Sequence, residues 1–167
     1  MTTIIIGVGN PVLTDDGVGL KIARELKRAL SARKDIETCE LCAGGLRLAE
    51  AMAGYDRAIV IDAIVSQGGP PGSILVLAPS DLRKTRNTCS SHDAGLAEAL
   101  ELARIAGLQM PKEITIWAIE AGDVETFSER LTEPVALAVP RVVEGVIRYL
   151  AGDGVLPPQR AAGEDVA

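Results

Sequence analysis

The 167-residue sequence predicts a three-layer α/β/α sandwich with a mostly parallel, twisted sheet of about five strands. Three observations support this fold class. Short apolar runs alternate along the chain with segments of helical periodicity. The strongest runs are apolar at nearly every position, which is typical of strands buried on both faces of a parallel sheet. Hydrophobic residues make up 47% of a chain long enough to bury a core of its own.

Strands are predicted where β-branched and aliphatic residues run together between turn formers. The run TIIIGV near the N-terminus stops at Gly and Asn, and RAIVIDAI in mid-chain is interrupted only by Asp62. The expected strands are residues 3–8, 36–41, 57–64, 73–77 and 114–119.

Helices are predicted where apolar residues recur at steps of three and four. Thr14, Asp15 or Asp16 can cap the first of them, since carboxylates and hydroxyls suit a helix start. Pro140 lies inside the last one, after a cap at Thr132, and should kink or divide it. The expected helical segments are residues 14–30, 46–53, 79–84 (at most a turn), 92–106 and 134–150.

No internal repeat or interdomain linker is apparent, so residues 1–150 are expected to form one domain. The remainder, residues 151–167, has many turn formers and little apolar content, and we expect a flexible tail.

Composition excludes several classes of function. A net charge of −6 and an aromatic content of 2% argue against nucleic acid, which favours basic surfaces and stacking rings. No stretch approaches the roughly 20 apolar residues that span a bilayer, and no signal peptide is recognisable. Three cysteines are too few for a disulfide scaffold, so a cytoplasmic protein is expected. The single histidine, His92, excludes a metal site built from several histidines.

Three residues fall where an α/β sheet gathers its functional groups, at the carboxyl ends of parallel strands. Asp16 follows the first strand, Asp62 lies near the end of the third, and His92 opens a helix after a polar loop. A charge in a doubly buried strand is costly unless it is paired or lies at an open end. Two carboxylates and an imidazole form an open site for divalent ions of the nickel, iron or zinc kind.

Two other interpretations stay open. Cys39, Cys42, Cys89 and His92 have the residue types of a structural zinc site, although Cys39 lies in an expected strand, where residues three apart point to opposite faces. The loop GVGNPV resembles the start of a dinucleotide-binding fingerprint, but Val12 stands where the third glycine belongs.

Four motifs in order are specific to one family. GVGNPVLTDDGVG, IVIDAI, SSHDAGL and IWAIE resemble the hydrogenase maturation endopeptidases over about residues 3–150. This resemblance implies an aspartic-type endopeptidase activity with an α/β/α fold, which activates another enzyme by processing it. Its substrate is the large-subunit precursor of a nickel-iron hydrogenase, which loses a C-terminal extension after nickel insertion.

The resemblance also implies that Asp16, Asp62 and His92 are the catalytic and metal-binding positions. The nickel is then carried by the precursor, and the protease needs no permanently bound metal. Asp15 and Glu120 are additional candidates, because both are expected near the same sheet edge. Either the metal polarises the scissile carbonyl or a carboxylate activates water.

One segment departs from the family pattern. The family commonly has an acidic residue, Gly and Thr before the second helix, where this chain reads Glu40-Leu41-Cys42-Ala43-Gly44-Gly45. The acid and the glycines are kept and the threonine is lost, which bears on the substrate loop and on the identity of the hydrogenase partner. The oligomeric state does not follow from the sequence.

Overall fold

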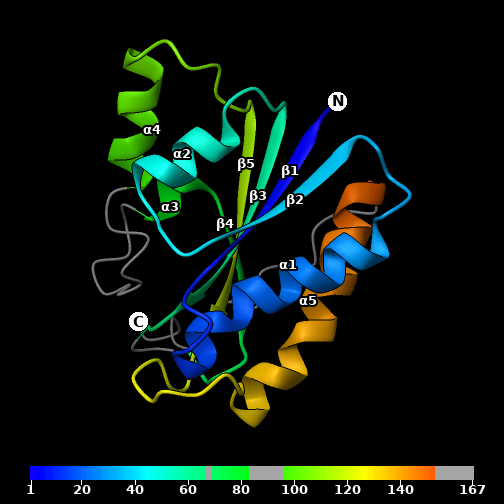
Figure 1. Cartoon of the computed structure of the whole chain (residues 1–167), viewed down its shortest axis with the longest axis vertical. Helices are drawn as coiled ribbons and strands as arrows, with labels where there is room; N and C mark the ends of the chain where they lie inside the picture. The colour runs from blue at the N-terminus through cyan, green and yellow to red at the C-terminus, as the bar shows by residue number, and fades with distance from the viewer. Residues whose placement is uncertain (67–68, 83–95, 153–167) are drawn as a thin grey trace, which may run out of the picture.

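The computed structural model describes residues 1–66, 69–82 and 96–152 (Figure 1). Five strands and six helical segments alternate along the chain in these parts. The strands are β1 (Thr3–Val8), β2 (Ile36–Leu41), β3 (Arg57–Ile64), β4 (Ile74–Leu77) and β5 (Glu113–Glu120). The helices are the 3-10 turn η1 (Thr14–Gly17), α1 (Val18–Ala29), α2 (Leu46–Met52), α3 (Pro79–Leu82), α4 (Leu96–Ile105) and α5 (Glu133–Ala151).

The five strands form one sheet in the order β2-β1-β3-β5-β4. All neighbouring pairs are parallel except β4 with β5, because β4 turns back directly after β3. Helices α1 and α5 cover one face of this sheet, and α2, α3 and α4 lie on the other (Figure 1). The predicted three-layer fold with a mostly parallel sheet is therefore confirmed.

Each face of the sheet has its own apolar core. Side chains of α1 and α5 pack with Ile59, Ile61 and Trp117 on one side. Side chains of α2 and α4 pack with Ile6 and Val60 on the other. Both β1 and β3 are thus buried on two faces, as their largely apolar sequences predict.

The strand order creates a switch point between β1 and β3. The chain leaves β1 through α1 to reach β2 on one side, and then returns through α2 to β3 on the other side of β1. The helices on these two connections lie on opposite faces, and in sheets of this kind ligands bind at such a point, outside the carboxyl ends of the strands. The fold thus singles out the sheet edge where Asp16 and Asp62 were expected.

Helix α1 begins unusually close to this edge. A Cβ added at Gly19 would lie 2.3 Å from the carbonyl oxygen of Ile61 and 2.4 Å from that of Val8. These are backbone atoms in β3 and β1, so no side chain fits between them and the helix. Glycine at this position lets the first turn of α1 contact the backbones of both strands next to Asp62.

The sequence expectation about the start of the first helix is wrong. None of Thr14, Asp15 and Asp16 caps α1, because they form η1 instead and α1 starts after Gly17 without a side-chain cap. Of the two effects expected at Pro140, a kink or a division of the last helix, division does not occur, since α5 runs continuously through it. The missing hydrogen bond costs about 3 kcal/mol, and the fully buried apolar face of this helix offsets it (Val135, Ala138, Val142 and Val146).

Two further expectations concern the C-terminal tail and membrane-spanning helices. The predicted tail, residues 151–167, lies outside the described residues from residue 153 onward. No helix in the described part of the chain is long and apolar enough to cross a membrane.

Candidate active site

Asp62 is a buried carboxylate near the carboxyl end of β3. It is only 1% exposed, and its Oδ1 accepts the backbone N–H of Ala63 at 2.8 Å. Val60 packs in the core on the α2 and α4 side and Ile61 in the core on the α1 and α5 side. Since side chains alternate along a strand, Asp62 lies on the same face as Val60, which is the face covered by α4.

Asp16 lies in η1, directly after the loop that leaves β1. It is 9% exposed, and its Oδ2 accepts the backbone N–H of Asn10 at 2.8 Å. Gly9 allows this arrangement, because a Cβ there would lie 1.8 Å from the carbonyl oxygen of Asp16, and its φ of +148° disfavours other residues. The loop therefore folds back over η1 and fixes the backbone that carries Asp16.

The structure brings η1 against β3, so the segments that carry Asp16 and Asp62 pack together at one sheet edge. Neither carboxylate is more than 9% exposed, and buried carboxylates favour a cation or hydrogen-bond donors nearby. Within the described residues, no group of three or more His, Cys, Asp or Glu side chains could hold a metal ion by itself. A metal ion at this edge would need ligands beyond those that the described part supplies.

His92 and Cys89 lie outside the described residues. The first described residue after them, Leu96, starts α4 and is fully buried on the face of the sheet that Asp62 shares. The sequence thus places His92 four residues before a helix of the correct layer.

Asp15 has a different role from its neighbour. It is fully buried and accepts four hydrogen bonds from described residues. The backbone N–H groups of Gly122 (2.9 Å) and Asp123 (3.0 Å) and the hydroxyl of Thr132 (2.8 Å) donate to Oδ2, and the N–H of Thr132 (2.7 Å) donates to Oδ1. This carboxylate joins η1 to the β5–α5 segment.

Thr14, immediately before the two aspartates, has a φ of +44°, the only positive φ outside glycine in the described chain. Such a conformation costs about 1–3 kcal/mol and persists only where the surroundings enforce it. Here the N–H of Thr14 donates to the carbonyl of Ser128 (2.8 Å), and its hydroxyl donates to that of Thr126 (2.6 Å). The strained turn is thereby locked to the β5–α5 segment.

Glu120, the last residue of β5, is 2% exposed, and both of its carboxylate oxygens accept hydrogen bonds. Its Oε1 accepts the backbone N–H of Ser66 at 2.6 Å, and its Oε2 accepts the hydroxyl of the same residue at 2.8 Å. It therefore fixes the chain where it leaves β3. Asp15 and Glu120 lie near the same sheet edge, as expected, and both carboxylates accept hydrogen bonds from backbone N–H groups and a side-chain hydroxyl.

Two residues of the zinc alternative, Cys39 and Cys42, lie in the described part of the chain. Cys39 packs with Leu41 against the core on the α2 and α4 side. Cys42 is exposed and follows directly after the end of β2. The zinc site stays a hypothesis, since its other two residues, Cys89 and His92, lie outside the described residues.

The glycine loop after β1 also differs from a dinucleotide site. In that fold, glycines let the backbone approach a pyrophosphate at a helix N-terminus. Here, Cβ atoms at Gly7 and Gly9 would collide with the backbone carbonyls of Gly19 and Asp16. The glycines serve contacts within the protein, and two buried carboxylates precede α1 where an anion would have to bind.

Glu40, in the segment that departs from the family pattern, pairs with Arg24. The two form a salt bridge of 2.7 Å, and both carboxylate oxygens accept N–H groups of the guanidinium. The hydrogen bond from Arg24 to Glu40 raises the pKa of Arg24, and the charge of Glu40 adds to this effect. The acidic residue of this segment thus fastens the end of β2 to α1.

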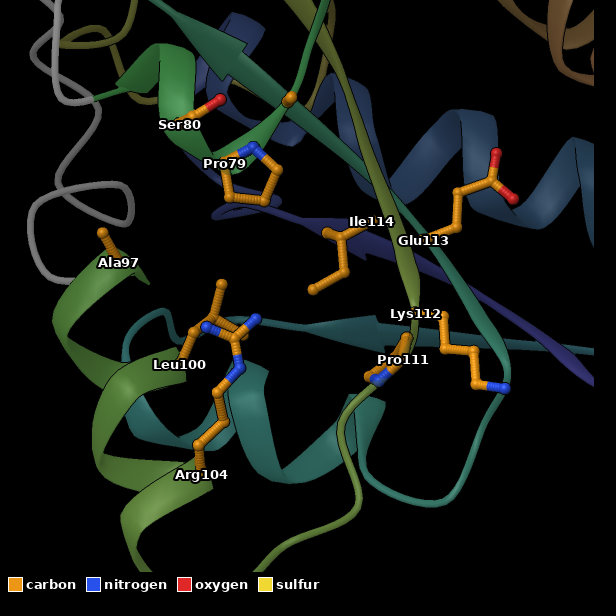
Figure 2. A pocket seen from close by; sticks show the side chains of 10 residues that line it. Pro79, Ser80, Ala97, Leu100, Arg104, Pro111, Lys112, Glu113 and Ile114 are labelled. Atoms are coloured by element: carbon orange, nitrogen blue, oxygen red, sulfur yellow. The ribbon is translucent and has the colours of Figure 1, made fainter.

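A pocket of about 540 Å³ lies between α3, α4 and the start of β5 (Figure 2). Glu113 and Ile114 line it, so it opens at the amino end of β5. Asp62 is paired with Ala118, much further along that strand. The pocket and the two buried aspartates therefore occupy opposite edges of the sheet.

Comparison with known proteins supports one family. The family model for hydrogenase maturation proteases matches residues 20–149. Hydrogenase 2 maturation protease from Escherichia coli is 30% identical over 166 residues, which cover 99% of this chain and 100% of that protein. Hydrogenase expression/formation protein HupD from Rhizobium leguminosarum is 28% identical over 98% of this chain and 81% of its own length.

Solved structures agree with these relatives. The hydrogenase maturating endopeptidase HybD from Escherichia coli superposes with a TM-score of 0.75 at 30% identity, covering 92% of this chain and 94% of that one. The [NiFe] hydrogenase maturation protease HybD from Thermococcus kodakarensis gives a TM-score of 0.71 at 27% identity, with coverages of 90% and 99%. The chain is therefore a peptidase and belongs to the hydrogenase maturation protease family.

Proposed function

We propose that this peptidase removes the C-terminal extension of a nickel-iron hydrogenase large-subunit precursor once nickel has been inserted. In this proposal Asp16, Asp62 and His92 bind the nickel that the precursor carries. The observation that supports it most is the placement of two almost fully buried aspartates at the switch point of the sheet. Buried carboxylates at the carboxyl ends of parallel strands are suited to a divalent cation that another molecule delivers.

Hydrogen bonds fix the segments around the two aspartates, which suits a site that binds its substrate in one geometry. Asp15 and Glu120 hold the segments on either side, and Asn10 holds the Asp16 carboxylate itself. Ligands whose own positions are fixed by hydrogen bonds lose little freedom when a metal arrives. Binding of the nickel then positions the adjacent peptide bond, and this proximity supplies much of the rate.

Two routes to peptide cleavage follow from this arrangement. In one, the nickel polarises the scissile carbonyl. In the other, Asp16 or Asp62 accepts a proton from the attacking water. An Asp→Asn variant separates them, because the amide oxygen still binds a metal but cannot act as a base. A variant that binds the nickel-loaded precursor and cuts it slowly indicates the second route.

We also propose that the reaction takes place in the cytoplasm. The thiols of Cys39 and Cys42 are both unpaired, which suits a reducing compartment.

The proposal is tested by incubating the purified protein with nickel-loaded precursor and detecting the shortened subunit by mass spectrometry. We expect Asp16→Ala, Asp62→Ala and His92→Ala to lower the cleavage rate by at least about a hundredfold. Asp35→Asn is the matched control, because this exposed carboxylate pairs with Arg33 just before β2, at the opposite edge. Equal rates in all four variants would refute the site assignment.

A further inference from the structure

Phe127 is displayed to solvent on the segment that joins β5 to α5. It is the one phenylalanine of the chain, and it is 82% exposed. Exposed single apolar residues are common on protein surfaces and need no explanation by themselves. The surroundings of Phe127 distinguish it, because the backbone on both sides is held firmly in place.

The residues that flank Phe127 are anchored to η1 and its approach. On one side, the carbonyl of Thr126 accepts the hydroxyl of Thr14 at 2.6 Å. On the other, Ser128 accepts the N–H of Thr14 at 2.8 Å and donates its own N–H to the carbonyl of Val12 at 3.0 Å. A short bridge between Leu13 and Ser128 completes the contact. The aromatic ring therefore projects from a backbone with little freedom.

A second exposed apolar side chain belongs to the same contact. Val12, whose carbonyl binds Ser128, is 42% exposed. Val12 and Phe127 directly precede the bridged residues Leu13 and Ser128, so their backbones lie side by side. More than a hundred residues of sequence separate them. Together they form a pair of exposed apolar residues whose backbone is held by hydrogen bonds, which we name the Val12–Phe127 step.

This step is built onto the segment that carries the buried aspartate. Val12, Leu13 and Thr14 are the residues through which the loop after β1 reaches Asp15 and Asp16. Each of them is bonded or bridged to the strand-like stretch around Ser128. The backbone next to Phe127 is therefore joined by hydrogen bonds to the residues that lead directly into Asp16.

We propose that the Val12–Phe127 step is the docking surface for the protein substrate, and that it receives an apolar side chain of the precursor next to the scissile peptide. A peptidase must hold a stretch of polypeptide on either side of the bond it cuts, and metal contact alone fixes only one point of it. Rigid aromatic residues contribute strongly to protein interfaces, because they bury a large apolar area with little loss of side-chain freedom. This inference rests on the proposed function, since it names a second contact for the same substrate.

The test uses cleavage kinetics and direct binding with the full-length protein and nickel-loaded precursor. We expect Phe127→Ser to raise KM for the precursor about tenfold or more, with little change in kcat and no change in melting temperature. Phe127→Leu, which keeps an apolar side chain, should restore most of the affinity. Ile105→Ser is the matched control, because Ile105 is 75% exposed at the end of α4, near the amino edge of the sheet.

The outcomes separate this inference from the proposed function. A wild-type KM and affinity in Phe127→Ser would overturn the docking surface, as would an equal loss in Ile105→Ser or a fall in kcat at unchanged KM. Wild-type protein that binds the precursor through Phe127 but leaves it uncut would overturn the proposed function alone. Wild-type protein that neither binds nor cuts the precursor would overturn both.

Discussion

The carboxylate of Asp15 binds both the backbone N–H and the hydroxyl of Thr132, at 2.7 and 2.8 Å, across 117 residues of sequence. Thr132 is the residue from which α5 starts. The same carboxylate also accepts the N–H groups of Gly122 and Asp123, just beyond β5. One buried side chain therefore closes the β5–α5 segment into a loop pinned at both ends, next to the turn that carries Asp16.

Asp15→Ala should destabilise the protein strongly, because it leaves four donors in a buried region without an acceptor. We expect a loss of about 3 kcal/mol or more in the free energy of unfolding, measured by urea denaturation. Asp35→Ala, at an exposed carboxylate, should change it by about 0.5 kcal/mol or less. A stable Asp15→Ala variant that has lost all cleavage activity would instead identify Asp15 as a catalytic residue.

Glu120→Gln should retain most of the activity. The amide oxygen can still accept the N–H of Ser66, and the hydroxyl of Ser66 can rotate to accept from the amide group. Glu120→Ala leaves the N–H and the hydroxyl of Ser66 without their acceptor and should release the chain after β3. We expect a loss of about 1–3 kcal/mol in the free energy of unfolding. Cleavage rates and melting temperatures of the two variants check this. Loss of cleavage in Glu120→Gln at unchanged stability would point to proton transfer by this carboxylate.

Gly19→Ala should impair both stability and cleavage. The new Cβ would meet the carbonyl oxygens of Ile61 and Val8, so α1 must move away from the sheet beside Asp62. We expect a cost of about 1–3 kcal/mol or more, as for overpacked cores, and a lower cleavage rate in the protein that remains folded.

Gly54→Ala is the control for that substitution. Gly54 has a φ of +88° and open space around it, so alanine there costs about 1 kcal/mol in backbone strain without moving an element of the site. Its cleavage rate should equal that of the wild type. Similar cleavage in the two variants would contradict the role given to the close approach of α1.

Zinc content tests the alternative based on cysteines. Because Cys39 lies in β2 and packs against the apolar core, whereas Cys42 is exposed, we expect no stoichiometric zinc that depends on Cys39. Metal analysis of purified wild-type protein and of Cys39→Ser measures this directly. One zinc per chain in the wild type, absent from Cys39→Ser, would favour the zinc-stabilised module.

The fold could be predicted from the sequence nearly element by element. The apolar runs of β1 and β3 mark strands buried on two faces, and the expected bounds of both match those observed. The helix ends were harder, because the two aspartates before α1 have the composition of a cap but bind elsewhere. Asp15 binds residues more than a hundred positions away in the sequence. Such contacts cannot be predicted from the local sequence pattern.

The candidate site could be predicted in its position but not in its division of roles. The rule that parallel strands gather ligands at their carboxyl ends places Asp16 and Asp62 correctly at one edge. Adjacent aspartates look alike in sequence, and only the structure separates Asp15, which binds Thr132, from Asp16, which binds Asn10. No sequence signal indicated the contacts of Ser66, Ser128 or Phe127.

The central claim is that nickel held by the precursor is what the two aspartates and His92 recognise. The most direct measurement compares cleavage of nickel-loaded and nickel-free precursor by the same enzyme preparation, followed by mass spectrometry of the large subunit. The account predicts rapid removal of the extension from the nickel-loaded form and almost none from the nickel-free form. Equal cleavage of both forms would contradict it.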